Sequence, residues 1–95
     1  MPSVTRVGDK NTGHDSCSPT NLITGSPNVF VNNKPVGRKG DKYSSHGCIS
    51  HSSHSDVISD GSSTVKVNNL PIARVGDKVS IGGSVATGSP NVKAG

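Results

Sequence analysis

Large apolar side chains are scarce in this 95-residue sequence, which has no Trp, one Phe and one Tyr. Hydrophobic residues make up 28% of it, well below the roughly 45–50% that is usual in globular domains. A chain this short also buries a smaller share of its surface than a longer one does. Either it is disordered, or something besides a hydrophobic core holds it together. Patterned Val and Ile runs and internal repeats argue against disorder.

Other absences narrow the functional classes. No apolar run approaches the about 18 residues of a membrane-spanning helix, and the first ten residues lack the apolar stretch of a secretory signal peptide. The formal net charge of +4 is spread along the chain as single Lys and Arg residues. With almost no aromatic side chains to stack on bases, we expect no nucleic-acid partner.

Two phrases recur along the chain. The first is Arg-x-Gly-Asp-Lys, at residues 6–10, 38–42 and 74–78. The second is a Gly-Ser turn followed by a Val-rich run, at residues 24–33, 60–69 and 87–93. Both are too long to recur by chance, so the repeat is the strongest signal in the sequence.

Each repeat predicts a short β-hairpin. The runs Asn28–Val31 and Thr64–Val67 favour strands, and the Asn-Asn pairs at 32–33 and 68–69 favour tight turns. No helical period extends beyond a turn, so the predicted class is all-β. Three similar hairpins separated by unequal inserts predict one domain, residues 1–95, folded as a small pseudo-threefold cone with the inserts gathered at one end. The inserts span residues 11–23, 43–59 and 79–86.

The first two inserts hold all four His and both Cys. Zn²⁺ takes four such ligands in tetrahedral geometry, and a structural zinc contributes on the order of 10 kcal/mol to the folding of a small domain. We therefore predict one structural Zn²⁺ near the end where the inserts meet. The first-choice ligands are His14, His46, Cys48 and His54, with Cys17 and His51 as alternates.

Two alternatives to this structural site stay open. Cys17 and Cys48 could instead form a disulfide. The metal could also be catalytic, because Asp15 and Asp56 flank the cluster. No known hydrolase motif is present, however, and the repeated acidic residues suit turns rather than one active site. The sequence therefore predicts a protein that is not an enzyme and has no small-molecule substrate.

Part of the repeat is similar to a known family. The phrases Pro35–Arg38 and Pro71–Arg74, each followed by x-Gly-Asp, resemble the proline–alanine–alanine–arginine (PAAR) repeat. The Gly-Ser-Pro-Asn-Val run resembles the strand that precedes it in that family, and the resemblance covers Val4 to Gly95. Gly37 and Ile72 replace alanines, and the copy at residues 4–6 lacks the proline.

The resemblance implies a spike tip. PAAR proteins are sharp cones whose broad base caps a trimeric β-helical spike, one chain per trimer, and whose apex holds a metal bound by His and Cys. They pierce the target cell envelope for contractile phage tails and type VI secretion systems. This chain would be a tip without an effector extension, located in a virion or secreted by type VI machinery. The family often has a Cys in the third apical loop, where this chain has Ser80–Gly83, so the ligand set stays open.

Two other functions remain as alternatives to the spike tip. One is a stand-alone zinc-binding interaction module. The other is a small metallohydrolase, delivered as a toxin.

Overall fold

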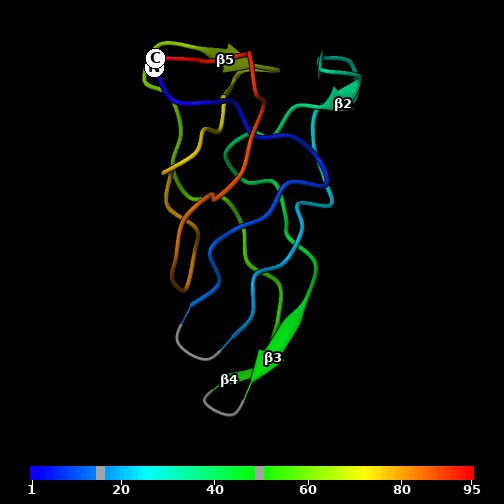
Figure 1. Ribbon diagram of the computed structural model, residues 1–95, viewed down its shortest axis with the longest axis vertical. Coiled ribbons are helices and arrows are strands. Elements are labelled where there is room, and N and C mark those ends of the chain that lie inside the picture. Colours follow the sequence, from blue (N-terminus) through cyan, green and yellow to red (C-terminus); the bar gives the residue numbers. More distant parts are fainter. Residues whose placement is uncertain (15–16, 49–50) are drawn as a thin grey trace.

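The computed structural model describes residues 1–14, 17–48 and 51–95, and the side chains of these residues except 46–48 and 51–53. Short strands, isolated β-bridges and turns make up the described chain, which contains no helix, and this confirms the predicted all-β class. The strands are β1 (Phe30–Val31), β2 (Lys34–Pro35), β3 (His46–Cys48), β4 (His51–His54), β5 (Lys66–Val67) and β6 (Leu70–Pro71). Figure 1 shows β2, β5 and both termini at a broad end, and β3 and β4 at the opposite, narrower end.

Two hairpins at the broad end follow the sequence prediction. β1 pairs with β2 and β5 pairs with β6, both antiparallel. The connecting residues Asn32, Asn33, Asn68 and Asn69 all have positive φ, between 53° and 65°. Two consecutive residues with positive φ define the type I′ turn that matches the twist of a hairpin, so the predicted Asn-Asn turns are confirmed.

In the third unit, the two paired segments come from the two ends of the described chain, and no turn connects them. Residues 2–4 pair with residues 92–94, through the Ser3–Lys93 bridge and a hydrogen bond from the Val4 amide to the Val92 carbonyl at 3.0 Å. Equivalent bonds join Val36 to Val29 and Ile72 to Val65 in the other two hairpins. The run at 87–93 and the phrase at 4–6 therefore belong to one unit, although they lie far apart in the sequence.

The three units meet in a closed ring of backbone hydrogen bonds. The Gly37 amide donates to Thr5, Ala73 donates to Gly37, and Thr5 donates to Ala73, at 2.9, 3.0 and 3.1 Å. All three residues are buried. A Cβ at Gly37 would lie 2.8 Å from the side chains of both Leu22 and Thr5, too close for a real contact. This crowding explains why residue 37 is a glycine.

Each unit also holds an ion pair between its Arg and its Asp. The guanidinium groups of Arg6, Arg38 and Arg74 donate to the carboxylates of Asp9, Asp41 and Asp77, three residues further on. The same carboxylate accepts a hydrogen bond from the arginine's own backbone amide, at 2.7–2.9 Å. Burial alone would raise the pKa of Asp9, but the hydrogen bonds and charge of Arg6, with the hydroxyl of Thr87, hold it below its ordinary value.

Serine and asparagine side chains link neighbouring units. The buried hydroxyls of Ser26 and Ser89 donate to the side-chain oxygens of Asn68 and Asn32, both at 2.7 Å. In the third copy Ser62 donates to the carbonyl oxygen of Gly95 instead. Each of these hydroxyls also accepts bonds from the backbone amides that follow it. The repeated phrases are therefore conspicuous in the sequence because they build the contacts between units.

The hydrophobic core is small and falls into two clusters. One lies under the hairpins. The other surrounds Tyr43, which is fully buried, and is formed mostly by residues of the three inserts. The members of this second cluster are Leu22, Tyr43, Ile58, Ala73, Val79 and Val85. None of the described residues lies in a helix long and apolar enough to cross a membrane.

Candidate metal centre

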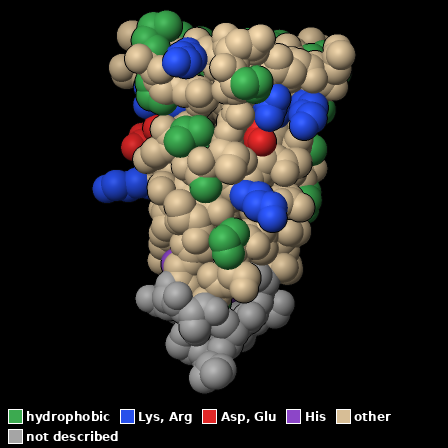
Figure 2. Space-filling view, in the orientation of Figure 1, with side chains coloured by type: hydrophobic (Ala, Val, Ile, Leu, Met, Phe, Trp, Pro, Cys, Tyr) green, Lys and Arg blue, Asp and Glu red, His purple; other side chains and the backbone are tan. Residues whose placement is uncertain are grey.

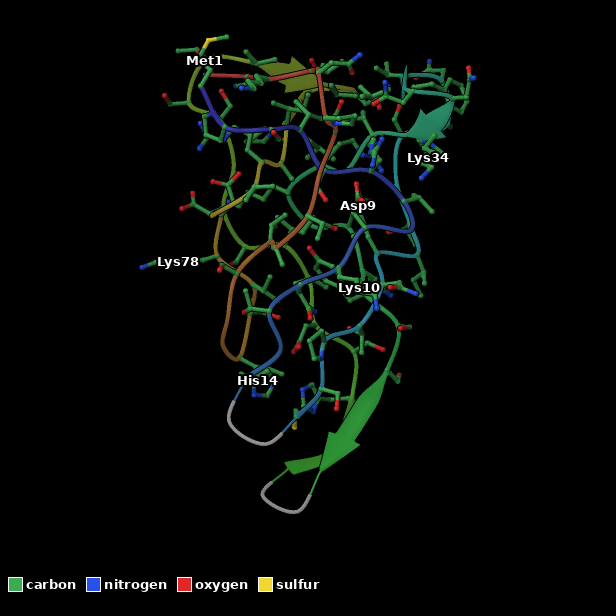
Figure 3. The ribbon with its side chains drawn as sticks, viewed as in Figure 1. Met1, Asp9, Lys10, His14, Lys34 and Lys78 are labelled. Atoms are coloured by element: carbon green, nitrogen blue, oxygen red, sulfur yellow. The ribbon has the colours of Figure 1, made fainter. Side chains whose placement is uncertain are left out.

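The backbone around His14 is held in a tight reversal. His14 and Cys17 exchange two backbone hydrogen bonds, at 3.2 and 2.8 Å. The preceding Gly13 has a φ of 71°, and a Cβ there would lie 2.5 Å from the Cys17 carbonyl oxygen. A Cβ added at Gly82, in the third insert, would lie only 3.0 Å from the Cβ of His14. The imidazole is consequently confined, and its side chain is only 6% exposed. Figure 3 shows His14 toward the narrow end.

The second insert supplies the other two members of the cluster. His54 ends β4, whose backbone pairs with β3 through His54 and His46. Two residues later, the carbonyl of Asp56 accepts a hydrogen bond from the Tyr43 amide at 2.9 Å. This bond anchors Asp56 beside the core, where its side chain is 1% exposed. The next residue, Val57, donates to the hydroxyl of Ser80 and so connects the second insert to the third.

The three side chains converge on a small volume. The Nε2 atoms of His14 and His54 lie 3.1 Å apart. Asp56 faces both rings, with Oδ2 3.5 Å from Nε2 of His14 and Oδ1 3.3 Å from Nε2 of His54. Each residue offers one ligand atom, and these atoms all lie within 4.8 Å of one another. The group could therefore hold a metal ion.

The donor set and its spacing both suit a divalent metal. Imidazole nitrogen and carboxylate oxygen bind zinc at about 2.0–2.2 Å, which places neighbouring tetrahedral ligands about 3.3–3.6 Å apart. The two ring nitrogens lie 3.1 Å apart, and each lies 3.3–3.5 Å from a different oxygen of Asp56, so each separation is close to that edge length. The 3.1 Å contact also suits a hydrogen bond between one protonated and one unprotonated ring nitrogen.

The structure brings together two of the four first-choice ligands. His14 and His54 lie in the cluster, whereas the side chains of His46, Cys48 and the alternate His51 lie outside the described part of the chain. The other alternate, Cys17, is 5% exposed and takes part in a disulfide. In that oxidised form its sulfur is not the thiolate that binds metals.

Asp56 is a cluster member that the sequence pattern does not predict as a ligand. In the sequence it is a carboxylate that flanks the His and Cys residues, whereas in the structure its side chain is buried and faces both imidazoles. A usable signal was its place two residues after His54, in a Ser-rich segment where Asp56 is the only acidic residue from Tyr43 to Ser59. A single carboxylate among several histidines is a common metal-ligand pattern.

Comparison with known protein families and curated proteins gives this site no family or function. No family model matches the sequence, and no curated protein matches it.

Proposed function

We propose that this chain is a spike tip of the PAAR type, which caps a trimeric β-helical spike of a contractile phage tail or a type VI secretion system. The repeated phrases and their resemblance to the PAAR repeat support the proposal. So does the closed ring of bonds at Thr5, Gly37 and Ala73, because it relates three unequal stretches of one chain by a pseudo-threefold axis. In this proposal the protein is a non-enzymatic part of a virion or of a secreted assembly.

The observation that carries the proposal is a threefold set of valines at the broad end. Val29, Val65 and Val92 occupy equivalent places in the three hairpins, and each is 37% exposed. A monomer can match a trimer only if it presents similar surfaces three times, as these valines do. More apolar surface is exposed in the hairpins and beside them, on Met1, Phe30 and Leu70. Figure 2 shows hydrophobic side chains on the surface of the broad end.

At the opposite end, the metal cluster would brace the point of a pseudo-threefold cone. We propose one structural Zn²⁺ held by His14, His54 and Asp56, with a fourth ligand from His46 or His51. Cys48 is not proposed, because it is the only other cysteine in the sequence and Cys17 is oxidised. Such an ion would join the first and second inserts through His14 on one side and His54 and Asp56 on the other. A point fixed by metal–ligand bonds would resist axial force better than loops held by solvent-exposed hydrogen bonds.

Stoichiometry tests the proposal. The chain is mixed with a trimeric β-helical spike fragment, and the mass of the complex is measured by light scattering after size exclusion. We expect one chain per trimer. Val65→Asp should weaken the complex by more than about 100-fold, because a charge would replace a buried apolar contact. The matched control is Ile81→Asp, at a side chain that is 62% exposed in the third insert, and it should leave binding unchanged. Three chains per trimer, or no complex, would refute the spike-tip function.

A second candidate is a stand-alone zinc-binding interaction module. The cluster of His14, His54 and Asp56 supports it equally well, because a metal site needs no spike. Hydrogen exchange on the isolated chain separates the two functions. Slow exchange throughout the broad end would favour the stand-alone module, whereas fast exchange there that slows when the spike fragment is added would favour the spike tip.

A further inference from the structure

One lysine recurs at the same place in all three units. Lys10, Lys42 and Lys78 each follow the turn that ends in the paired aspartate, and all three are exposed. Their carbonyls accept equivalent hydrogen bonds from the next unit, donated by Ala86, Ile23 and Ser59. Figure 3 shows Lys10 and Lys78 on different sides of the molecule, between the broad end with Lys34 and the narrow end with His14. We call Lys10, Lys42 and Lys78 the lysine girdle.

The lysines dominate the surface charge. Each of the three arginines is neutralised by the aspartate of its own turn. Among the described residues no lysine takes part in an ion pair, and Asp60 is the one exposed acidic side chain. In Figure 2 the blue side chains accordingly stand out from the body with few red ones beside them.

On the narrow-end side of the girdle, the amino-acid composition of the chain changes. The inserts at 11–23, 43–59 and 79–86 contain no Lys or Arg. Three residues after Lys78, Ile81 is 62% exposed and has a φ of 71°, a conformation that is unfavourable for a β-branched residue. An exposed apolar side chain therefore lies nearer the point than the ring of cations does. In a membrane the apolar interior likewise lies deeper than the charged headgroups.

We propose that the lysine girdle binds the anionic headgroups of a phospholipid bilayer around the place where the point enters it. This inference rests on the proposed function, in which the narrow end meets a membrane. Lysines on three sides of a cone can all be engaged at once only by a partner that surrounds it, and a headgroup layer does so. A nucleic-acid duplex would reach one side, and Phe30, the only exposed side chain among Phe, Tyr and Trp, lies in the β1–β2 hairpin at the broad end.

Vesicle binding by the full chain tests the girdle. Affinity is measured by co-sedimentation with vesicles of phosphatidylcholine alone and of phosphatidylcholine mixed with phosphatidylglycerol. Each Lys→Gln change in the girdle should weaken binding to the anionic vesicles by about fivefold, and the triple variant by on the order of 100-fold. The control variant K34Q/K66Q/K93Q loses the same charge at the broad end and should weaken binding by less than about threefold.

Several outcomes would overturn the proposal. They are equal losses in the girdle and control variants, no preference for anionic vesicles, or tighter binding to duplex DNA than to anionic vesicles. Single girdle changes without effect would also overturn it, because they would show that the chain binds by one side at a time. The girdle variant should still form the complex with the spike fragment. If the unmodified chain forms no complex with the spike fragment, the spike-tip function is refuted. The vesicle measurements decide lipid binding separately.

Discussion

The broad and narrow ends of the molecule are held together by different kinds of interaction. Toward the broad end, three kinds of contact recur in all three units: the ring of backbone bonds, the Arg–Asp pairs, and the bonds from serine hydroxyls to a neighbouring segment. At the narrow end His14, His54 and Asp56 form one cluster, and the three inserts around it differ in length and sequence. Repetition thus accounts for one end, and a single polar site for the other.

This difference teaches how a chain so poor in large side chains can fold. Repeated polar contacts spread stability over equivalent places, so that losing one leaves its counterparts intact. Among the described residues, the cluster of His14, His54 and Asp56 has no counterpart elsewhere in the molecule, so the narrow end depends on a few side chains. Changes at the narrow end should therefore have larger and more local effects than the same kind of change in a repeat.

Metal removal should produce the largest effect. We expect about one Zn per chain by elemental analysis, and a large fall in the melting temperature on chelation, because a structural zinc contributes on the order of 10 kcal/mol. His14→Ala and Asp56→Ala should each abolish most of this chelator-sensitive stability. Lys66→Ala, at an exposed position in β5, serves as the control and should leave both metal content and melting temperature unchanged.

The disulfide that includes Cys17 is a competing explanation for the stability of the narrow end. If it supports the narrow end without metal, a reductant should destabilise the chain by about 3 kcal/mol while a chelator does nothing. A chain that purifies without metal and melts identically with and without chelator would contradict the metal site.

Breaking one Arg–Asp pair should have a smaller effect. Asp9→Asn leaves the guanidinium of Arg6, whose residue is 8% exposed, without its charged partner, and losses of about 3 kcal/mol are typical when one member of such a pair is removed. Urea denaturation at neutral pH measures the change. Asp60→Asn is the matched control, because Asp60 is exposed, and should cost less than about 0.5 kcal/mol.

The same pair predicts a pH dependence. The pKa of Asp9 is lowered in the folded chain, so its contribution is fully present above the unfolded value of about 3.9. That contribution is lost as the pH falls through the lower folded-state pKa. The difference in unfolding free energy between the unmodified chain and Asp9→Asn should therefore shrink below about pH 4. A constant difference down to that range and beyond would contradict the ion pair.

The features that were predictable from sequence are those with local signals. The Asn-Asn turns could be predicted because few residues tolerate two successive positive φ values, and the repeat itself gave the all-β class. The pairing of residues 2–4 with 92–94 was not predicted, because no turn connects these segments in the sequence. An unpaired strand phrase at 87–93 and a half-phrase at 4–6 were the available signs.

The candidate site was predictable only in part. Their origin in different inserts predicts that His14 and His54 share the site, and the structure does bring them together. Asp56 was not chosen as a ligand, because local sequence does not reveal that the bond from the Tyr43 amide fixes it beside the core. Which side chains of two long inserts meet depends on tertiary packing, and neither spacing nor composition encodes it directly.

The smallest predicted effect lies at the boundary between the two ends. Tyr43 is fully buried, and its hydroxyl has no hydrogen-bond partner among the described residues. Burial raises its pKa, and the charges of Asp9 and Asp77 raise it further, so the group stays a neutral phenol. Because an unpaired buried hydroxyl costs free energy, Tyr43→Phe should be neutral or should stabilise the chain by about 1 kcal/mol.

Thermal and urea unfolding of Tyr43→Phe, compared with Val79→Ala in the same core cluster, measure this effect. Val79→Ala should destabilise by about 1–3 kcal/mol, because it removes buried methyl groups and leaves a cavity. If Tyr43→Phe instead destabilises as much as Val79→Ala, the hydroxyl has a partner that matters. Tyr43 would then be held by a polar contact, as the narrow end is. The part of the molecule that depends on single rather than repeated interactions would extend past Tyr43 toward the hairpins.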